Sequence, residues 1–151
     1  MLPKTTERVR RNTAQEINLE LERDSRQNLA RLTTSGPDSI ARRIEQLDEE
    51  WNIERALEAN AAVAMLVGLG LGVTISRKLL VIPAIVGGFL LQHALQGWCP
   101  PVPIMRRLGF RTPSEIAREK YALKAIRGDF RAVPAGVNGG PIAEQAWDAA
   151  G

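Results

Sequence analysis

The chain has 151 residues, of which 44% are hydrophobic and 25% are charged, and its formal net charge at pH 7 is +3. These averages are ordinary for one soluble domain, but the charge is segregated, because Arg77 and Lys78 are the only formal charges between Ala59 and Trp98. The flanks hold too few large apolar residues for a core of their own. The single cysteine, Cys99, excludes an internal disulfide framework and a cysteine-rich metal site.

Residues 1–37 form a charged N-terminal segment that is helix-prone to about Leu32. The apolar residues at helical spacing are Ile17, Leu21, Leu29 and Leu32. So narrow an apolar stripe gives a helix that is only marginally stable on its own. The start of the chain lacks the apolar stretch of a secretory signal, so we expect any membrane insertion to come from its interior. Turn formers end the segment, since Pro37 disfavours a helical conformation at Gly36.

An amphipathic helix is expected over residues 38–58. Its apolar residues fall near one face and are Ile40, Ile44, Leu47, Trp51 and Leu57. One interpretation is a helix that packs on a neighbour, and the other is a helix lying in the membrane interface with Trp51 as its anchor. The acidic run at residues 48–50 argues against close contact with anionic lipid.

Two uncharged stretches follow, residues 59–75 and residues 79–98. At 1.5 Å of rise per residue they extend about 25 Å and about 30 Å, which suffices to cross a bilayer. Three residues join them, so the two helices must be antiparallel neighbours. Pro83 falls in or near the first turn of the second helix, which we expect to begin near Leu80 or Val81. Because nothing else in the chain can wrap two such helices, we predict a transmembrane hairpin over residues 59–98.

Residues 99–130 are predicted to form a proline-rich turn and a second amphipathic helix. Cys99-Pro100-Pro101-Val102-Pro103 cannot continue the preceding helix. Thr112-Pro113-Ser114-Glu115 is a helix start signal with a Thr N-cap, and the helix should run to about Arg127, where Gly128 stops it. This helix either lies on an anionic leaflet or docks on the protein.

The predicted fold class is therefore an all-α membrane protein with a two-helix transmembrane hairpin, flanking amphipathic cytoplasmic helices and a disordered tail. The tail is residues 131–151, which are rich in Gly, Pro and Ala. Near the membrane ends, three arginines precede the hairpin and four follow it, against Arg77 and Lys78 in its turn. The positive-inside rule then places both termini in the cytoplasm, in a multi-pass protein of the cell inner membrane.

Small residues at four-residue spacing mark both predicted spans. They are Ala64, Gly68 and Gly72 in the first span, and Ala84 and Gly88 in the second. Small side chains let helix backbones approach closely, either within the hairpin or between protomers. Since two helices make a small membrane unit, we expect a homo-oligomer.

Three polar residues, Gln92, His93 and Gln96, lie inside the second span. Interhelical hydrogen bonding, a proton relay and an axial haem ligand are the alternatives. We favour hydrogen bonding, because His93 lies only five residues from Trp98 and no ligand partner other than Cys99 is near. We accordingly expect no metal and no cofactor.

Cys99 is the candidate reactive thiol. It stands at the membrane edge and is followed by Arg106 and Arg107, an electropositive setting that favours a thiolate. No second cysteine stands by to resolve an oxidised form, so we favour a structural cysteine. The chain also lacks a phosphate-cradling glycine loop, a Ser-His-Asp constellation and a cluster of metal ligands, so we predict neither a catalytic residue nor an enzyme.

Three stretches of the sequence, residues 51–61, 92–101 and 108–112, resemble the YgaP-like transmembrane domain family. The most recognisable part is Cys99-Pro100 after the second span, followed by Leu108-Gly109-Phe110-Arg111-Thr112. The similarity is greatest to a longer bacterial branch that carries an acidic helix before the hairpin. The resemblance implies a small inner-membrane hairpin that dimerises and has no established activity of its own. Some members carry a rhodanese sulfurtransferase, for which the 58 residues before Ala59 are too few, so sulfur transfer is not implied here.

Together these features predict a non-enzymatic membrane protein that self-associates in the lipid bilayer. It would present cytoplasmic helices to a cytoplasmic or membrane protein partner, and no nucleic-acid partner is expected. One alternative is a membrane accessory to sulfur or redox chemistry through Cys99. Another is a small channel or transporter component that uses Gln92, His93 and Gln96.

Overall fold

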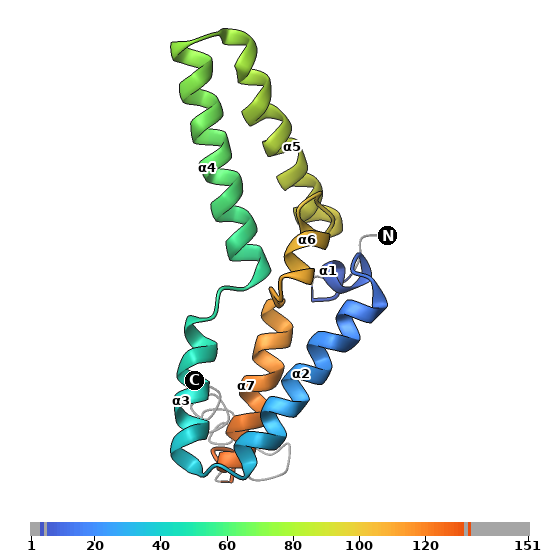
Figure 1. Ribbon diagram of the computed structural model, residues 1–151, viewed down its shortest axis with the longest axis vertical. Helices are drawn as coiled ribbons and strands as arrows, with labels where there is room; N and C mark the ends of the chain where they lie inside the picture. Colours follow the sequence, from blue (N-terminus) through green and yellow to red (C-terminus); the bar gives the residue numbers. More distant parts are fainter. Residues whose placement is uncertain (1–3, 5, 132, 134–151) are drawn as a thin grey trace. The chain divides into compact units, whose positions relative to one another are not determined.

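The computed structural model describes residue 4, residues 6–131 and residue 133. All regular elements of this part of the chain are helices, which confirms the predicted all-helical class (Figure 1). The chain divides into two compact units. The first unit comprises Met1–Leu21 and Trp51–Ser114, and the second comprises Glu22–Glu50 and Glu115–Gly151.

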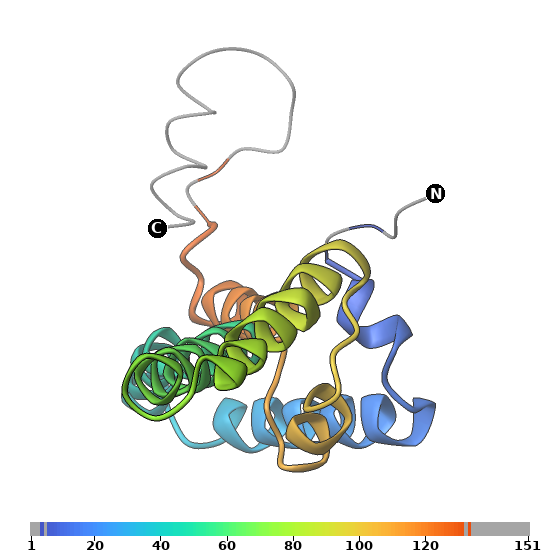
Figure 2. The same cartoon turned by 90° about the horizontal axis from the view of Figure 1, so that it is seen from above.

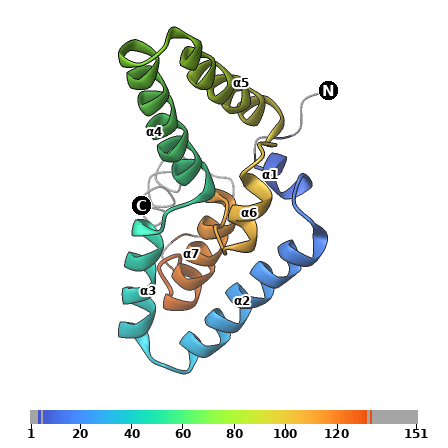
Figure 3. The ribbon, with the colours of Figure 1, turned by 45° about the horizontal axis from the view of Figure 1, so that its top comes forward.

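Two long helices dominate the first unit, α4 (Ile53–Thr74) and α5 (Val81–Gln96). The 3-10 helix η1 (Arg77–Leu80) connects them, so that α4 and α5 are joined at one end and lie apart at the other (Figure 3). The helix α5 begins at Val81, as predicted from the position of Pro83. Near the joined end the helices touch, because a Cβ atom built on Gly68 would lie 2.8 Å from Pro83 Cδ. Glycine is thus the residue that lets α4 approach this closely.

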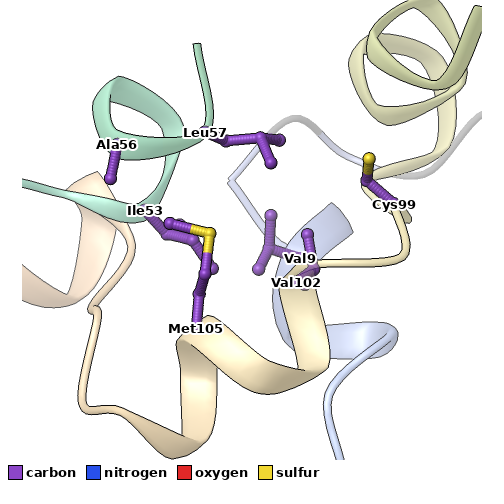
Figure 4. Packing of buried hydrophobic residues seen from close by; sticks show 7 residues of the cluster. All are labelled: Val9, Ile53, Ala56, Leu57, Cys99, Val102 and Met105. Carbon is purple, nitrogen blue, oxygen red and sulfur yellow. The ribbon is translucent and has the colours of Figure 1, made fainter. Parts of the chain in front are cut away.

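The open end of this helix pair is filled by α1 (Arg8–Arg11) and α6 (Val102–Arg107). A hydrophobic core lies here, which we call the base cluster: Val9, Ile53, Ala56, Leu57, Cys99, Val102 and Met105 (Figure 4). The helix α5 ends at Gln96, before the proline-rich turn and two residues short of the predicted span end at Trp98. The proline-rich turn itself starts α6, because Pro103 stands near the helix start, where its missing N–H costs little.

The second unit is built from the end of α2 (Gln15–Thr33), from α3 (Pro37–Glu49) and from α7 (Pro113–Arg127). Its core consists of Ile40, Ile44, Leu47, Ile116 and Leu123, with Leu29 and Leu32 packed against them. The Arg43 Nε donates to Glu119 Oε1 at 2.9 Å, and Lys120 Nζ donates to Asp48 Oδ1 at 2.6 Å, so α3 and α7 are joined by charge as well as by apolar contact.

The helix predicted over residues 38–58 is in fact two helices. The chain leaves helical geometry at Glu50, and Asn52 caps a new helix by accepting a hydrogen bond from Arg55 N at 2.8 Å. Ile40, Ile44 and Leu47 therefore belong to the second core, whereas Leu57 belongs to the base cluster. The boundary between the units falls between Glu50 and Trp51, where the helix is interrupted.

Other helix boundaries agree with the predictions to different degrees. The turn before Pro37 and the helix ending at Arg127 are confirmed. The N-terminal helix is divided, since α1 and α2 are separated by a bend in which Thr13 Oγ1 donates to Val9 O at 2.8 Å. The predicted disorder of residues 131–151 falls, apart from residues 131 and 133, outside the described residues.

Two helical stretches are long and apolar enough to cross a membrane, the one that contains α4 and Arg77–Gln96. Each has a mean hydropathy of 1.7 over its most apolar 18 residues. Only 22% of that segment is buried in the first stretch and 6% in the second. Their large side chains point outward on several faces. Among those at least half exposed are Val63, Leu66, Val67, Leu69, Val73, Ile75, Val81, Ile85 and Leu91.

Candidate functional site

In the first unit, the side chains that form hydrogen bonds or ion pairs between different helices lie around the base cluster. The N-terminal end of α4, the C-terminal end of α5, α1 and α6 meet there. Each of the sequence-predicted polar residues except Gln92 and Gln96 lies buried at this place.

Arg8 ties α1 to both long helices. Its Nη2 forms an ion pair with Glu54 Oε1 at 2.8 Å, and its Nη1 donates to Ala94 O at 2.9 Å. Figure 2 shows α1 beside the C-terminal end of α5. Asn12 adds a hydrogen bond from Nδ2 to Gln96 O at 2.9 Å. The last carbonyl groups of a helix lack partners within it and carry partial negative charge, so a cation and an amide there satisfy them. Sequence reasoning missed this contact, because nothing local to α1 indicates a partner 86 residues away.

Gly97 makes the docking of α1 possible. It ends α5 with φ +77°, in the left-handed region that favours glycine. A Cβ atom at this position would lie 2.5 Å from the carbonyl carbon of Arg8. Gly97 is therefore required twice, for its own conformation and for the close approach of the Arg8 backbone.

Arg106 is a fully buried arginine that fastens α6 to the start of α2. Its Nη2 donates to Asn18 Oδ1 at 2.8 Å, and its Nη1 donates to Phe110 O at 3.0 Å. From the sequence, Arg106 was predicted only to be a positive charge near the membrane end and near Cys99. Its structural role depends on Asn18, which has no sequence signal pointing to it.

His93 is 5% exposed, and neither of its ring nitrogens has a hydrogen-bond partner among the described residues. Gln92 is half-buried, and Gln96 is exposed. Among the described residues, none of these three side chains forms the expected interhelical hydrogen bond. No cluster of three or more His, Cys, Asp or Glu residues that could hold a metal ion occurs in the described part of the chain.

Cys99 is 5% exposed and packs within the base cluster. Burial raises the pKa of its thiol, because an apolar environment disfavours the thiolate. The prediction that Arg106 and Arg107 create a setting favourable to the thiolate is wrong, because burial removes the Cys99 thiol from water and so disfavours its charged form. The arrangement suits a small core side chain better than a nucleophile.

The small residues of the two long helices separate into two groups. Gly68 is buried against Ile82 and Pro83 at the start of α5, Gly72 is buried against Leu80 of η1, and Ala64 is half-buried. Ala84 and Gly88 are exposed, and a Cβ atom on Gly88 would meet nothing within 4 Å. The first group thus packs the helix pair, whereas the second leaves an open small-residue face on α5.

The two residues singled out for possible chemistry are both buried at the base. Within the described residues, the buried imidazole of His93 has no hydrogen-bond partner, and the buried thiol of Cys99 lies in an apolar cluster. Among the described residues, neither has the hydrogen-bonded base or orienting partner that marks an activated nucleophile or general base. Comparison with protein-family models, with curated proteins and with solved structures found no match to this chain.

Proposed function

We propose that α4 and α5 cross a lipid bilayer as an antiparallel hairpin and that the protein is a non-enzymatic membrane scaffold. The observation that carries this proposal is the outward exposure of large apolar side chains along both helices, such as Leu66 at 69% and Val73 at 75%. Moving one exposed Leu or Val side chain out of water stabilises by about 1.5–3 kcal/mol. Apolar patches of this extent mark membrane or protein contacts, and their presence on several faces of two long helices favours lipid.

The open face at Ala84 and Gly88 supports self-association of the scaffold. In lipid, helices associate through close packing of small residues, because lipid tails are as apolar as leucine side chains. Gly68 and Gly72 are already used within the helix pair. The face of α5 that carries Gly88 is therefore the one we assign to a second copy of the chain.

The second unit is the part that we propose is presented to a cytoplasmic or membrane protein partner. The arginines that flank the two helices favour cytoplasmic termini by the positive-inside rule. An inner-membrane hairpin is also what the resemblance of residues 51–61, 92–101 and 108–112 to the YgaP-like transmembrane domain family implies. The redox alternative loses support, since Cys99 is buried and its thiol pKa is raised.

The membrane topology is tested with single cysteines in a Cys99→Ser background. A membrane-impermeant maleimide added to intact cells should label Ser76→Cys, in the turn between α4 and η1, and should spare Ser35→Cys until the cells are opened. Labelling of Ser35→Cys from outside, or equal labelling of both before lysis, would contradict the hairpin with cytoplasmic flanks.

Self-association is tested by chemical crosslinking in membranes. Gly88→Leu should abolish the crosslinked oligomer by filling the open face of α5. Gly70→Leu is the matched control, because Gly70 is also exposed with nothing within 4 Å of its Cβ position but lies on α4. An oligomer that survives Gly88→Leu, or is lost equally with Gly70→Leu, would rule out the assigned face.

A further inference from the structure

The second unit contains a polar cavity between α2 and α3. Its volume is about 360 Å³, within the range of small-molecule sites. The polar side chains that line it are Asn28, Arg31, Ser39, Arg42, Arg43 and Gln46. Three arginines face this cavity, and no carboxylate is among its lining residues.

Two of the three guanidinium groups have no carboxylate partner among the described residues. Arg31 Nη2 donates to Asn28 Oδ1 at 3.2 Å, and Arg42 Nη2 has only a 3.4 Å contact with Ser39 Oγ. Both acceptors are neutral, so the charges of Arg31 and Arg42 remain uncompensated. Elsewhere in this unit arginines meet acids, as Arg26 meets Glu22 at 2.7 Å.

Arg43 differs from Arg31 and Arg42, because ion pairs hold its side chain in place at the edge of the cavity. Its Nε is held at 2.9 Å by Glu119, whose side chain is 1% exposed, and its Nη2 lies 4.0 Å from Glu50. The side chain is thereby oriented, while Arg31 and Arg42 are exposed and free to close on a ligand. One ordered and two adaptable guanidinium groups are a suitable arrangement for gripping a compact anion.

We propose that this cavity binds a phosphate monoester group. A phosphate dianion matches the two uncompensated charges, and its several oxygens can accept from two guanidinium forks together with Ser39 or Gln46. A single carboxylate could accept hydrogen bonds from only one of the two guanidinium groups and would neutralise only one of their charges. The group has two possible sources, a soluble phosphorylated metabolite or the headgroup of phosphatidic acid in a membrane. This binding goes beyond the scaffold function and does not depend on it.

The test uses the full chain in a neutral detergent, with glycerol 3-phosphate as the soluble probe and isothermal calorimetry as the measurement. In the second arm, the chain is reconstituted in phosphatidylcholine nanodiscs with and without phosphatidic acid, and binding is followed by phosphorus NMR. The variant is Arg31→Gln with Arg42→Gln. The control pairs Arg23→Gln with Arg26→Gln, which removes the same charge from α2 outside the cavity lining.

Saturable binding in either arm that the Arg31/Arg42 variant weakens by about tenfold or more, and the control variant does not, is the expected result. The arm in which it occurs identifies the source of the phosphate. Absence of binding in both arms, or equal weakening by both variants, would overturn the proposal. So would equal affinity for succinate, a dicarboxylate of similar charge. Unchanged circular dichroism of the variants serves as the check on folding.

Discussion

Arg8 and Glu54, 46 residues apart in the sequence, form an ion pair of 2.8 Å that joins α1 to the first turn of α4. Both side chains are partly buried, at 19% and 29% exposure. Such a pair contributes more than a surface pair, because water screens it less. The same guanidinium also donates to Ala94 O at the end of α5, so removing its acidic partner should weaken the packing of α1, α4 and α5 at the base cluster.

Glu54→Gln should lower the free energy of unfolding in detergent by about 1–2 kcal/mol, between the values for exposed and buried pairs. Arg8→Gln should cost at least as much, since it also removes the bond to Ala94 O. In a double-mutant cycle the two losses should be non-additive by about 1 kcal/mol. Strict additivity would mean that the two side chains do not interact in the folded protein.

Gly97→Ala should destabilise the base more than an equivalent change elsewhere. Gly109 is the matched control, because it has φ +92° but nothing within 4 Å of its Cβ position. Gly109→Ala should cost about 1–2 kcal/mol from backbone conformation alone, and Gly97→Ala should cost more by the displacement of Arg8. Thermal unfolding gives the two values, and equal losses would show that α1 does not approach Gly97 closely.

His93→Leu should leave stability unchanged or raise it by about 1 kcal/mol, because a buried polar side chain without partners carries a desolvation penalty. His93→Ala should instead destabilise by leaving a cavity. Unfolding in detergent distinguishes the two. A loss with His93→Leu as large as with His93→Ala would indicate that the imidazole makes a stabilising polar contact.

Cys99 should react slowly with iodoacetamide at neutral pH in the folded protein and become reactive only above the pH at which an ordinary thiol ionises. The folded pKa is raised, so the stability linked to the protonated thiol is fully present below the unfolded pKa and is lost as the pH rises through the folded one. Cys99→Ser should remove that alkaline dependence. Rapid alkylation at neutral pH without unfolding would contradict the buried thiol.

The sequence was most informative where local signals act. Pro37, Pro83 and Pro113 each constrain a helix start, and Gly128 ends a helix with φ +94°, so these boundaries were predicted closely. The two uncharged stretches likewise indicated the helices long and apolar enough for a membrane. The cap at Asn52 was missed because the apolar residues on both sides continue a helical period, which concealed the break.

The candidate site was harder to predict because its contacts are distant in sequence. His93 and Cys99 were singled out as polar or reactive residues, but only their packing shows that one lacks partners and the other is desolvated. Arg106 and Asn18 are 88 residues apart, and their hydrogen bond leaves no periodic trace. Long-range polar pairing depends on the tertiary arrangement, which local propensity does not encode.

The docking of α1 against Gly97 imposes an order of events during synthesis. Residues 8–12 leave the ribosome long before residues 94–97, to which Arg8 and Asn12 bind. At a translation rate of about 5–20 residues per second, the 86 residues between Arg8 and Ala94 take about 4–17 s, during which α1 is without its partners. The Arg8 contact to the end of α5 can therefore close only after both long helices have been made, so its formation reports that assembly of the helix pair is complete.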